Sequence, residues 1–467
     1  MASPLWSWTA ADLAAAIRTK AIKSREAVDS VLDRIAALNP RLNALPYVLA
    51  DEARAAADAA DRVVAAGAAL GPLHGVPVTT KVNVDQEGWP TTNGLVALKD
   101  LVAAEDSPPV ANLRAAGAVI VGRSNVPAFS IRWYSDNDLH GRTLNPWNDG
   151  VTPGGSSGGA AAAIAAGMGP IGHGNDFGGS IRYPAYCCGI VGLRPSPGRV
   201  PAFNGTASEE RSIAPQLMSV QGPLARSVAD ARLGLVAMAR RDARDPNWVP
   251  APLEGPPGAK PVRVALYRGS AGDTPAPAVR EALDTAARLL VDAGYVVEEA
   301  APPHVDEAAH LWRTLVHDDM RRSLLPTMQK IGDEAVKTMY RHVLAGMGEM
   351  DRDAYLVALG RRLAIGRAWS LFFETHPLLL TAVSWQPPLP IGADTESAES
   401  LEGVLRAQSP LLGTAMLGLP GLSVPTGLAN GLPAGVQLVA ARWREDLLLQ
   451  AGAAIERAVG LVRWPGA

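Results

Sequence analysis

Apolar residues in the first part of the chain recur at the three- and four-residue spacing of amphipathic helices. This spacing covers residues 10–21, 24–38 and 51–66. Thr9 precedes the first of these segments and Asp12 lies in its first turn, a combination typical of a helix N-terminus. The sequence therefore predicts a helical N-terminal region over residues 1–70.

From Gly71 the pattern changes to short apolar runs bounded by Gly and Pro. The runs within 75–84, 115–126 and 170–176 are typical of buried strands, and an Ala-rich helix is predicted before the last of them. Strands that alternate with helices favour a parallel or mixed sheet covered on both faces. We expect this core to span residues 71–245.

A Pro-rich segment at residues 246–261 follows this core. We interpret it as a surface connection within one architecture, because a strand pattern resumes directly after it. The second half, 262–467, then contains the predicted elements: an amphipathic helix over 277–293, mainly helical sequence from 304 to 365, and two apolar strands within 421–441. We expect one domain over 1–467, with a variable helical region at about 304–377.

Composition excludes several classes of protein. Hydrophobic residues make up 48% and charged residues 19% of the 467 positions, as in ordinary globular proteins. The net charge of −3 leaves no excess of positive charge for a nucleic-acid backbone. No apolar stretch is long enough to span a membrane, and the first twenty residues lack the pattern of a secretory signal. Nucleic-acid and membrane partners are therefore not expected.

The two cysteines, Cys187 and Cys188, are adjacent in the sequence. Neighbouring cysteines cannot join distant segments, so a disulfide framework or a Cys-based zinc site is not expected. We interpret both as small core residues of a protein in a reducing compartment, and predict a cytoplasmic location.

The highest density of small residues is the run Gly154–Gly159, directly before the Ala-rich segment. Glycines at a helix start allow close backbone approach and expose free N–H groups, which could bind an anion. No Gly-Lys pair of a P-loop occurs, and the glycine spacing differs from the dinucleotide fingerprint. Nucleotide binding is therefore not expected.

A second small-residue loop, Asn175–Ser180, follows the short strand at 170–176. It places a serine behind two glycines whose N–H groups could line an oxyanion pocket. Taken alone this loop is equally typical of a structural turn, and the Gly-x-Ser-x-Gly elbow of the α/β-hydrolases is absent.

Both loops together resemble one family. The runs PGGSSGGAAAAIAAG and GNDFGGSIRYPAYCCGIVGLRP, preceded by GPLHGVPVTTKVN and NPW, are similar to the amidase signature hydrolases. The runs AAGAVIVGRSNVPAF, GLPGLSVPTGL and GLPAGVQLVA extend the resemblance over most of the chain, with 304–377 the least similar part. The resemblance implies an α/β fold with a central mixed sheet between helices, and hydrolysis of a carbonyl–nitrogen bond without a metal or other cofactor.

The resemblance also implies the catalytic residues. Ser180 corresponds to the nucleophile, Ser156 to a proton-relaying serine in a cis peptide, and Lys81 to the base. A lysine acts as a base only when it is neutral, so its pKa must fall by several units, and burial lowers it. Apolar flanks suited to such burial are present at Val76, Val78, Val82 and Val84.

The family's oxyanion donors are backbone N–H groups, which map onto Phe177, Gly178, Gly179 and Ser180. The chain departs from the family at Val82 and Ala128, where an acid is common, and at Phe177, where a smaller residue is usual. We expect the Phe177 ring to pack in the core; the alternative is that it narrows the acyl pocket.

Three further groups of residues have a functional and a structural interpretation. Asp176 and Arg182 flank the nucleophile loop, and we expect an ion pair that braces the loop; the alternative is a substrate-binding role. His74 is interpreted as a loop-bracing residue. His310 and His317, seven residues apart on a predicted helix, are expected on a solvated face, with a metal site as the alternative.

Candidate pocket residues are aromatic: Trp133, Tyr134 and Trp385, together with the loop at 200–215. They favour a small apolar aryl or alkyl amide or a carbamate (urethane), with esters as side substrates. One alternative is the glutamine-hydrolysing subunit of a tRNA-dependent amidotransferase, against which Tyr183 argues; another is a catalytically silent binding protein. We expect a monomer or homodimer.

Overall fold

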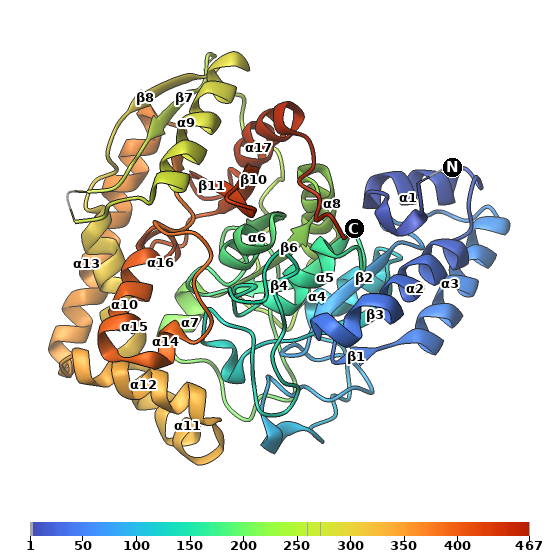
Figure 1. Cartoon of the computed structure of the whole chain (residues 1–467), viewed down its shortest axis with the longest axis horizontal. Coiled ribbons are helices and arrows are strands. Elements are labelled where there is room, and N and C mark those ends of the chain that lie inside the picture. Colours follow the sequence, from blue (N-terminus) through green and yellow to red (C-terminus); the bar gives the residue numbers. More distant parts are fainter. Residues whose placement is uncertain (1–2, 259, 271, 467) are drawn as a thin grey trace.

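The computed structural model describes residues 3–258, 260–270 and 272–466 (Figure 1). Its centre is a mixed sheet of eleven strands in the order β1-β3-β2-β4-β6-β5-β10-β11-β9-β7-β8. The strands are β1 (Tyr47–Val48), β2 (Pro77–Lys81), β3 (Val119–Ser124), β4 (Ile171–Asp176), β5 (Val191–Arg194), β6 (Val220–Ala225), β7 (Arg263–Leu266), β8 (Val296–Glu299), β9 (Leu378–Thr381), β10 (Gly421–Ala429) and β11 (Leu432–Ala440). The α/β fold with a mixed sheet, predicted from the sequence, is confirmed.

Helices surround this sheet and extend beyond it. They are α1 (Ala10–Arg18), α2 (Ser24–Leu42), α3 (Ala50–Ala65), α4 (Pro108–Ala115), α5 (Gly158–Ala165), α6 (Arg182–Cys188), α7 (Ile213–Met218), α8 (Val228–Met238), α9 (Pro277–Asp292), α10 (Val305–Ser323), α11 (Leu325–Ile331), α12 (Glu334–Gly346), α13 (Arg352–Thr375), α14 (Ala393–Glu396), α15 (Ala398–Ala407), α16 (Ser409–Met416) and α17 (Glu445–Val459), with short 3₁₀ helices η1 (Leu5–Ser7), η2 (Val96–Leu98) and η3 (Ala128–Ser130).

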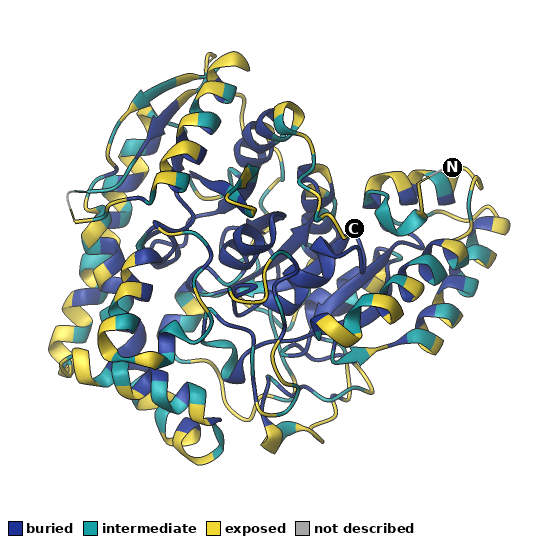
Figure 2. Ribbon diagram, in the orientation of Figure 1, coloured by how far each residue is buried: buried dark blue, intermediate teal, exposed yellow. Residues whose placement is uncertain are grey.

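Two apolar cores lie on opposite faces of the sheet. Along β3, Val119 and Val121 belong to one core and Ile120 to the other, as the two-residue alternation of strand side chains requires. The first core is shared with α2 and the Ala-rich helix α5, every residue of which is buried, as Figure 2 shows for the centre of the molecule. The second is shared with α8, α9 and α17.

The predicted N-terminal helices are confirmed, with small differences at their ends. The Thr9 hydroxyl accepts a hydrogen bond from the Asp12 N–H at 3.0 Å, which caps α1. Helix α2 runs four residues beyond its predicted end at 38 and contains Pro40. The predicted helical region from 304 to 365 consists of α10–α13 and continues to Thr375.

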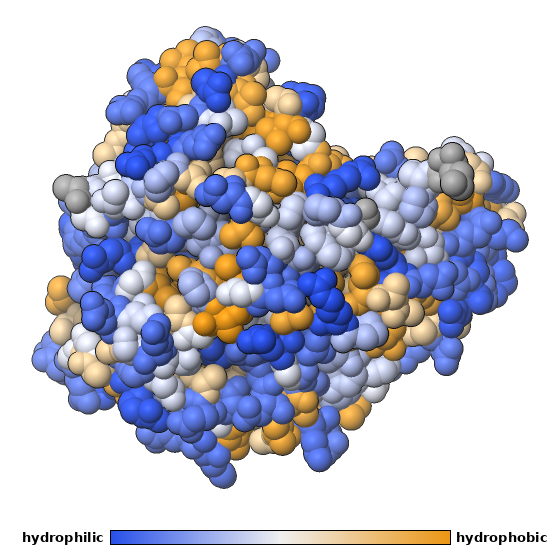
Figure 3. Space-filling model, in the orientation of Figure 1, coloured by the Kyte–Doolittle hydropathy of each residue, from blue (hydrophilic) through white to orange (hydrophobic). Residues whose placement is uncertain are grey.

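Helices α10–α16 lie together at the side of the molecule opposite α2 and α3 (Figure 1). The face shown in Figure 3 is mostly hydrophilic, with apolar side chains in small groups. Over the residues described, no helix is both long enough and apolar enough to cross a membrane.

Parallel pairing places two polar strand ends side by side. Strand β2 pairs parallel with both β3 and β4, so the carboxyl ends of these strands meet at one edge of the sheet. Lys81 is the last residue of β2, and Asn175 and Asp176 end β4. The glycine-rich segment before α5 approaches the same edge because it packs backbone against backbone: a Cβ at Gly159 would lie 2.4 Å from the Asn125 nitrogen.

Gly159→Ala should therefore destabilise the fold by at least about 2 kcal/mol, because rigid backbone atoms of Asn125 and Ala44 surround the position. Gly360→Ala in α13 is the matched control: nothing lies within 4 Å of its added Cβ, so we expect unchanged or up to about 1 kcal/mol higher stability. Urea unfolding of both variants measures the difference; equal stabilities would contradict the packing argument.

Candidate active site

Lys81 is a fully buried lysine at the end of β2. Its Nζ donates hydrogen bonds to Ser156 Oγ at 2.8 Å and to Asn175 Oδ1 at 2.6 Å. Burial lowers the Lys81 pKa well below its ordinary value, and the charge of Asp176 opposes this only in part. A neutral amine beside a serine hydroxyl can accept its proton, which is the electrostatic state that a lysine base requires.

Ser156 lies in the loop before α5 and is 1% exposed. The Gly155–Ser156 peptide is cis, the geometry that the resemblance implies. Gly155 packs against the chain at 132–134, where an added Cβ would lie 2.4 Å from the Arg132 carbonyl oxygen. The loop is thereby held with the Ser156 hydroxyl toward Lys81.

Ser180 lies between β4 and α6 and lines a cavity. Of the four predicted oxyanion donors, the Gly179 N–H already donates to Asp176 Oδ1 at 2.8 Å, so it is not free for that role. The N–H groups of Phe177, Gly178 and Ser180 make no hydrogen bond to any described residue. Three of the four predicted oxyanion donors are therefore free.

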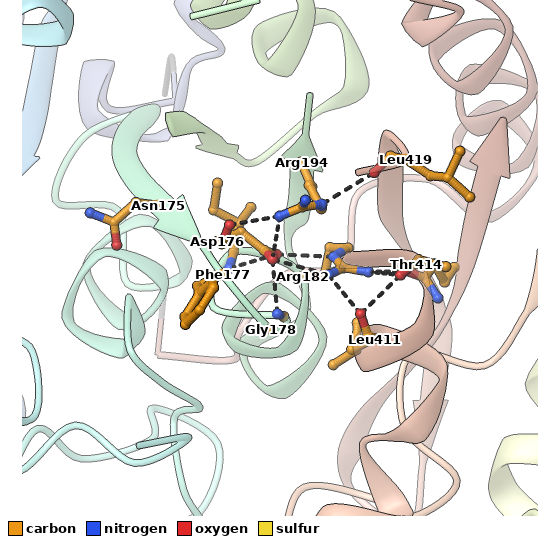
Figure 4. A network of polar contacts seen from close by, with 12 residues as sticks. Asn175, Asp176, Phe177, Gly178, Arg182, Arg194, Leu411, Thr414 and Leu419 are labelled. Carbon is orange, nitrogen blue, oxygen red and sulfur yellow. Dashed lines mark hydrogen bonds and ion pairs between the residues drawn. The ribbon is translucent and has the colours of Figure 1, made fainter. Parts of the chain in front are cut away.

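Asp176 is a buried carboxylate that holds this loop in place (Figure 4). Arg182 contacts its two oxygens at 3.0 Å each, and Arg194 contacts Oδ1 at 3.0 Å. The N–H groups of Gly179 and Ile181 also donate to it. The two guanidinium groups hold the Asp176 pKa well below its usual range even though burial opposes this. The charges of Asp176 and Arg182 thus pair with each other inside the protein.

Arg182 and Arg194 connect the loop to the second half of the chain. Arg182 donates to Thr414 Oγ1 at 2.5 Å and to Gln437 Oε1 at 2.6 Å, and Arg194 donates to the Leu419 carbonyl at 3.1 Å. Figure 4 shows Asn175 pointing away from this network, toward the opposite side of β4. Adjacent strand residues therefore serve two functions: Asn175 contacts Lys81 and Asp176 braces the loop.

The cavity beside Ser180 has about 630 Å³ of space between atoms, its open mouth included. Two tryptophans both line it and hold the nucleophile loop. The Trp133 Nε1–H donates to the Gly178 carbonyl at 3.1 Å, and the Trp312 Nε1–H donates to the Phe177 carbonyl at 3.0 Å. The Phe177 ring packs on Trp312, with centroids 5.6 Å apart, and also lines the cavity, so both interpretations of this residue apply.

Two of the three predicted pocket aromatics do not line this cavity. Tyr134 is 1% exposed, and the Arg132 guanidinium lies over its ring. Trp385 packs edge-on against Tyr267, donates to Ser409 Oγ at 2.8 Å and lines a separate cavity. Aromatic character predicts burial but not the direction in which a ring points, and only Trp133 is placed as expected.

The histidines also differ from expectation. His310 is exposed, but His317 is 9% exposed and lies in the wall of the Ser180 cavity, because α10 packs on α16 and turns this face inward. No cluster of three metal-ligating side chains occurs among the residues described. His74 Nε2 contacts the Ala60 carbonyl at 3.0 Å, which places it between a loop and α3.

Sequence reasoning missed three residues of the site. Asn175 binds Lys81, and Asn83 accepts from the Asn175 side chain at 3.0 Å. Asn83 follows Lys81 by two positions and Asn175 is the first residue of the nucleophile loop. A polar amide next to an apolar strand was the signal in the sequence that could have identified both residues. Trp312 lies in the helical region at 304–377, where no motif marked it in the sequence.

A buried amine with a lowered pKa, a serine that contacts it, a second serine at a cavity and free N–H groups together form an arrangement suited to acyl transfer. The family model described as Amidase matches residues 26–449. The chain belongs to this family, the amidase signature hydrolases, and is an enzyme that hydrolyses amide C–N bonds.

Among its relatives, the chain is 46% identical to an indoleacetamide hydrolase of Bradyrhizobium diazoefficiens, over 98% of this chain and 88% of that protein. It is 32% identical to a glutamyl-tRNA(Gln) amidotransferase subunit of Acidothermus cellulolyticus, over 96% and 94% of the two chains. Among solved structures, a bacterial aryl acylamidase of the amidase signature family superimposes with a TM-score of 0.82 at 28% identity, over 98% and 97% of the chains.

Asp176→Asn should lower the free energy of unfolding by about 3–5 kcal/mol, because it leaves two buried guanidinium groups without their counter-charge. Asp149→Asn is the control, since its ion pair with Arg41 is about half exposed and worth under about 1 kcal/mol. Denaturant unfolding distinguishes the two; a loss at Asp176 no larger than that at Asp149 would contradict the bracing role.

Proposed function

We propose that the chain hydrolyses a small amide with an aryl-bearing acyl group through an acyl-enzyme on Ser180. The observation that carries this proposal is the buried contact between Lys81 and Ser156 beside a serine-lined aromatic cavity. The relative at 46% identity is named for hydrolysis of an arylacetamide, which supports the same substrate class.

In the proposed mechanism, Ser180 attacks the amide carbonyl while its proton passes to Ser156 and the proton of Ser156 passes to neutral Lys81. The resulting oxyanion accepts hydrogen bonds from the N–H groups of Phe177, Gly178 and Ser180. Ser156 then protonates the departing nitrogen and is reprotonated by Lys81, which releases ammonia or an amine. Water repeats the cycle on the acyl-enzyme and releases the carboxylic acid.

Asn175 and Asn83 support the base in this scheme. The Asn175 Oδ1 accepts a hydrogen bond from Nζ beside the contact with Ser156, and Asn83 fixes the orientation of the Asn175 amide. The neutral Asn175 oxygen orients the Lys81 amine without raising the Lys81 pKa. The negative charge of an aspartate at this position would raise that pKa. The two hydrogen-bond partners of Nζ are therefore both uncharged, which favours the proton-accepting form of the lysine.

The cavity favours an apolar substrate over glutamine. Its two charged lining residues, Arg132 and Asp394, pair with each other at 2.7 Å, and Arg132 also contacts Asp136. The described wall therefore offers no unpaired charge for the amino and carboxylate groups of glutamine. Since carbamates and esters undergo the same acyl transfer, we expect them as additional substrates; a urethanase activity, a cytoplasmic location and a monomer or homodimer stay predictions.

Ser180→Ala and Lys81→Met should each lower kcat on an arylacetamide by at least about 10³-fold, because they remove the nucleophile and the base. Ser370→Ala and Lys330→Met on the exposed surface are the matched controls and should retain wild-type rates. Ammonia release by the purified chain alone is the measurement. Full activity of Ser180→Ala would show the nucleophile to be wrong, and wild-type inactivity on every amide, ester and carbamate tested would refute the proposal.

The pH profile tests the base separately. Protonated Lys81 cannot accept a proton, so kcat/KM should fall as the pH drops through the Lys81 pKa and be constant above it. Because burial lowers that pKa well below its ordinary value, the plateau should already be reached below the pH at which an exposed lysine titrates, about 10.4. A rate that keeps rising to that pH, or one independent of pH, contradicts the assignment.

A further inference from the structure

His317 is a buried side chain without a partner in the wall of the Ser180 cavity. It is 9% exposed, and neither Nδ1 nor Nε2 has a hydrogen-bond partner among the described residues. Its ring packs edge-on between Trp312 and Tyr340, with centroids 5.8 and 6.2 Å away. Buried polar atoms are nearly always hydrogen-bonded, so an unpartnered imidazole in a cavity wall is a candidate contact for a ligand.

The protonation state of His317 defines what it can bind. Burial, with the charge of Arg313 adding to it, lowers the His317 pKa to about 3, so the ring is neutral near neutral pH. A neutral imidazole carries one N–H donor and one bare acceptor nitrogen. It therefore suits an uncharged polar atom of a ligand and forms no ion pair with a carboxylate.

The other polar side chains on this wall, apart from Ser180, are already engaged. Ser130 Oγ donates to Asn93 Oδ1 at 2.7 Å, Arg132 pairs with Asp394, and the Tyr340 hydroxyl donates to the His317 carbonyl at 2.9 Å. The indole N–H groups of Trp133 and Trp312 are used on the nucleophile loop. Among the polar side chains of the described wall, His317 is therefore the free one, other than Ser180 itself.

The remaining wall has the shape and chemistry for a flat aromatic group. It contains rings and flexible thioethers from several elements: Trp133, Phe177, Trp312, Met320 and Met339, with Val343, Leu401 and Leu405 beside them. Such a lining binds an aromatic acyl group well but does not distinguish one ring system from another of equal size. The discrimination has to come from a polar group on the wall.

We propose that His317 is the specificity-determining residue of this cavity, and that its bare ring nitrogen accepts a hydrogen bond from the ring N–H of a fused heteroaromatic acyl group such as indole. This inference rests on the proposed hydrolysis of arylacetamides by Ser180. It names the feature of the acyl group that the enzyme selects, and it assigns that selection to α10, in the region of the chain least similar to the family.

Two substrates of nearly equal shape test the proposal. Indole-3-acetamide carries the ring N–H, and benzothiophene-3-acetamide has sulfur in its place and no donor. Wild type should prefer the indole by about tenfold or more in kcat/KM, the factor expected for one buried hydrogen bond. His317→Phe, which keeps an aromatic ring between Trp312 and Tyr340, should bring the ratio close to one by slowing the indole substrate alone.

His317→Gln offers an acceptor oxygen again and should restore part of the preference. His310→Phe, an exposed position on the same helix, is the matched control and should keep the wild-type ratio. A wild-type kcat/KM ratio near one between the two substrates overturns the inference. It is also overturned if His317→Phe slows both substrates equally. Wild-type failure on both substrates and on phenylacetamide and anilides instead refutes the proposed function, so the two failures are distinguishable.

Discussion

The active-site loop depends on one buried carboxylate. Asp176 pairs with both Arg182 and Arg194 and accepts hydrogen bonds from the N–H groups of Gly179 and Ile181, so a single side chain fixes the backbone on both sides of Ser180. A buried charge with two counter-charges and backbone donors tolerates few alternative arrangements, because any movement exposes an uncompensated charge to an apolar interior. The N–H groups of Phe177 and Gly178 are thereby left free and oriented.

The surroundings of Lys81, which contacts the same strand β4 through Asn175, differ from those of Asp176. Lys81 is as buried as Asp176, yet it receives only neutral oxygens from Ser156 and Asn175. Without an ion pair, burial favours the neutral amine, which is the form that can accept a proton. One residue of β4 provides the amide that orients the lysine, and the next provides the carboxylate that holds the loop. Their separation onto opposite sides of the strand keeps the Asp176 charge from forming an ion pair with Lys81.

Much of the cavity wall comes from a different part of the chain than the proposed catalytic groups. Lys81, Ser156 and Ser180 come from the sheet edge and its glycine-rich loops, whereas Trp312, His317 and Tyr340 come from α10 and α12. The Trp312 indole joins the two parts by its hydrogen bond to the Phe177 carbonyl. In the proposed function, this arrangement would allow the acyl pocket to vary while the acyl-transfer groups stay unchanged.

The sequence alone determined the local elements, and the proposed catalytic groups were named from it. The N-cap at Thr9, the strand before Lys81 and the loop at Asn175–Ser180 follow from short-range patterns, because apolar periodicity, capping and glycine conformations act over a few residues. The mixed sheet followed from alternating strands and helices. The tertiary structure decided which side chains share the cavity: it placed Trp133 there, excluded Tyr134 and Trp385, turned His317 inward and committed the Gly179 N–H to Asp176. Most of these outcomes depend on contacts between segments far apart in the sequence, such as that of Trp312 with Phe177. All of them depend on the direction of each side chain or N–H group, which no local pattern in the sequence encodes.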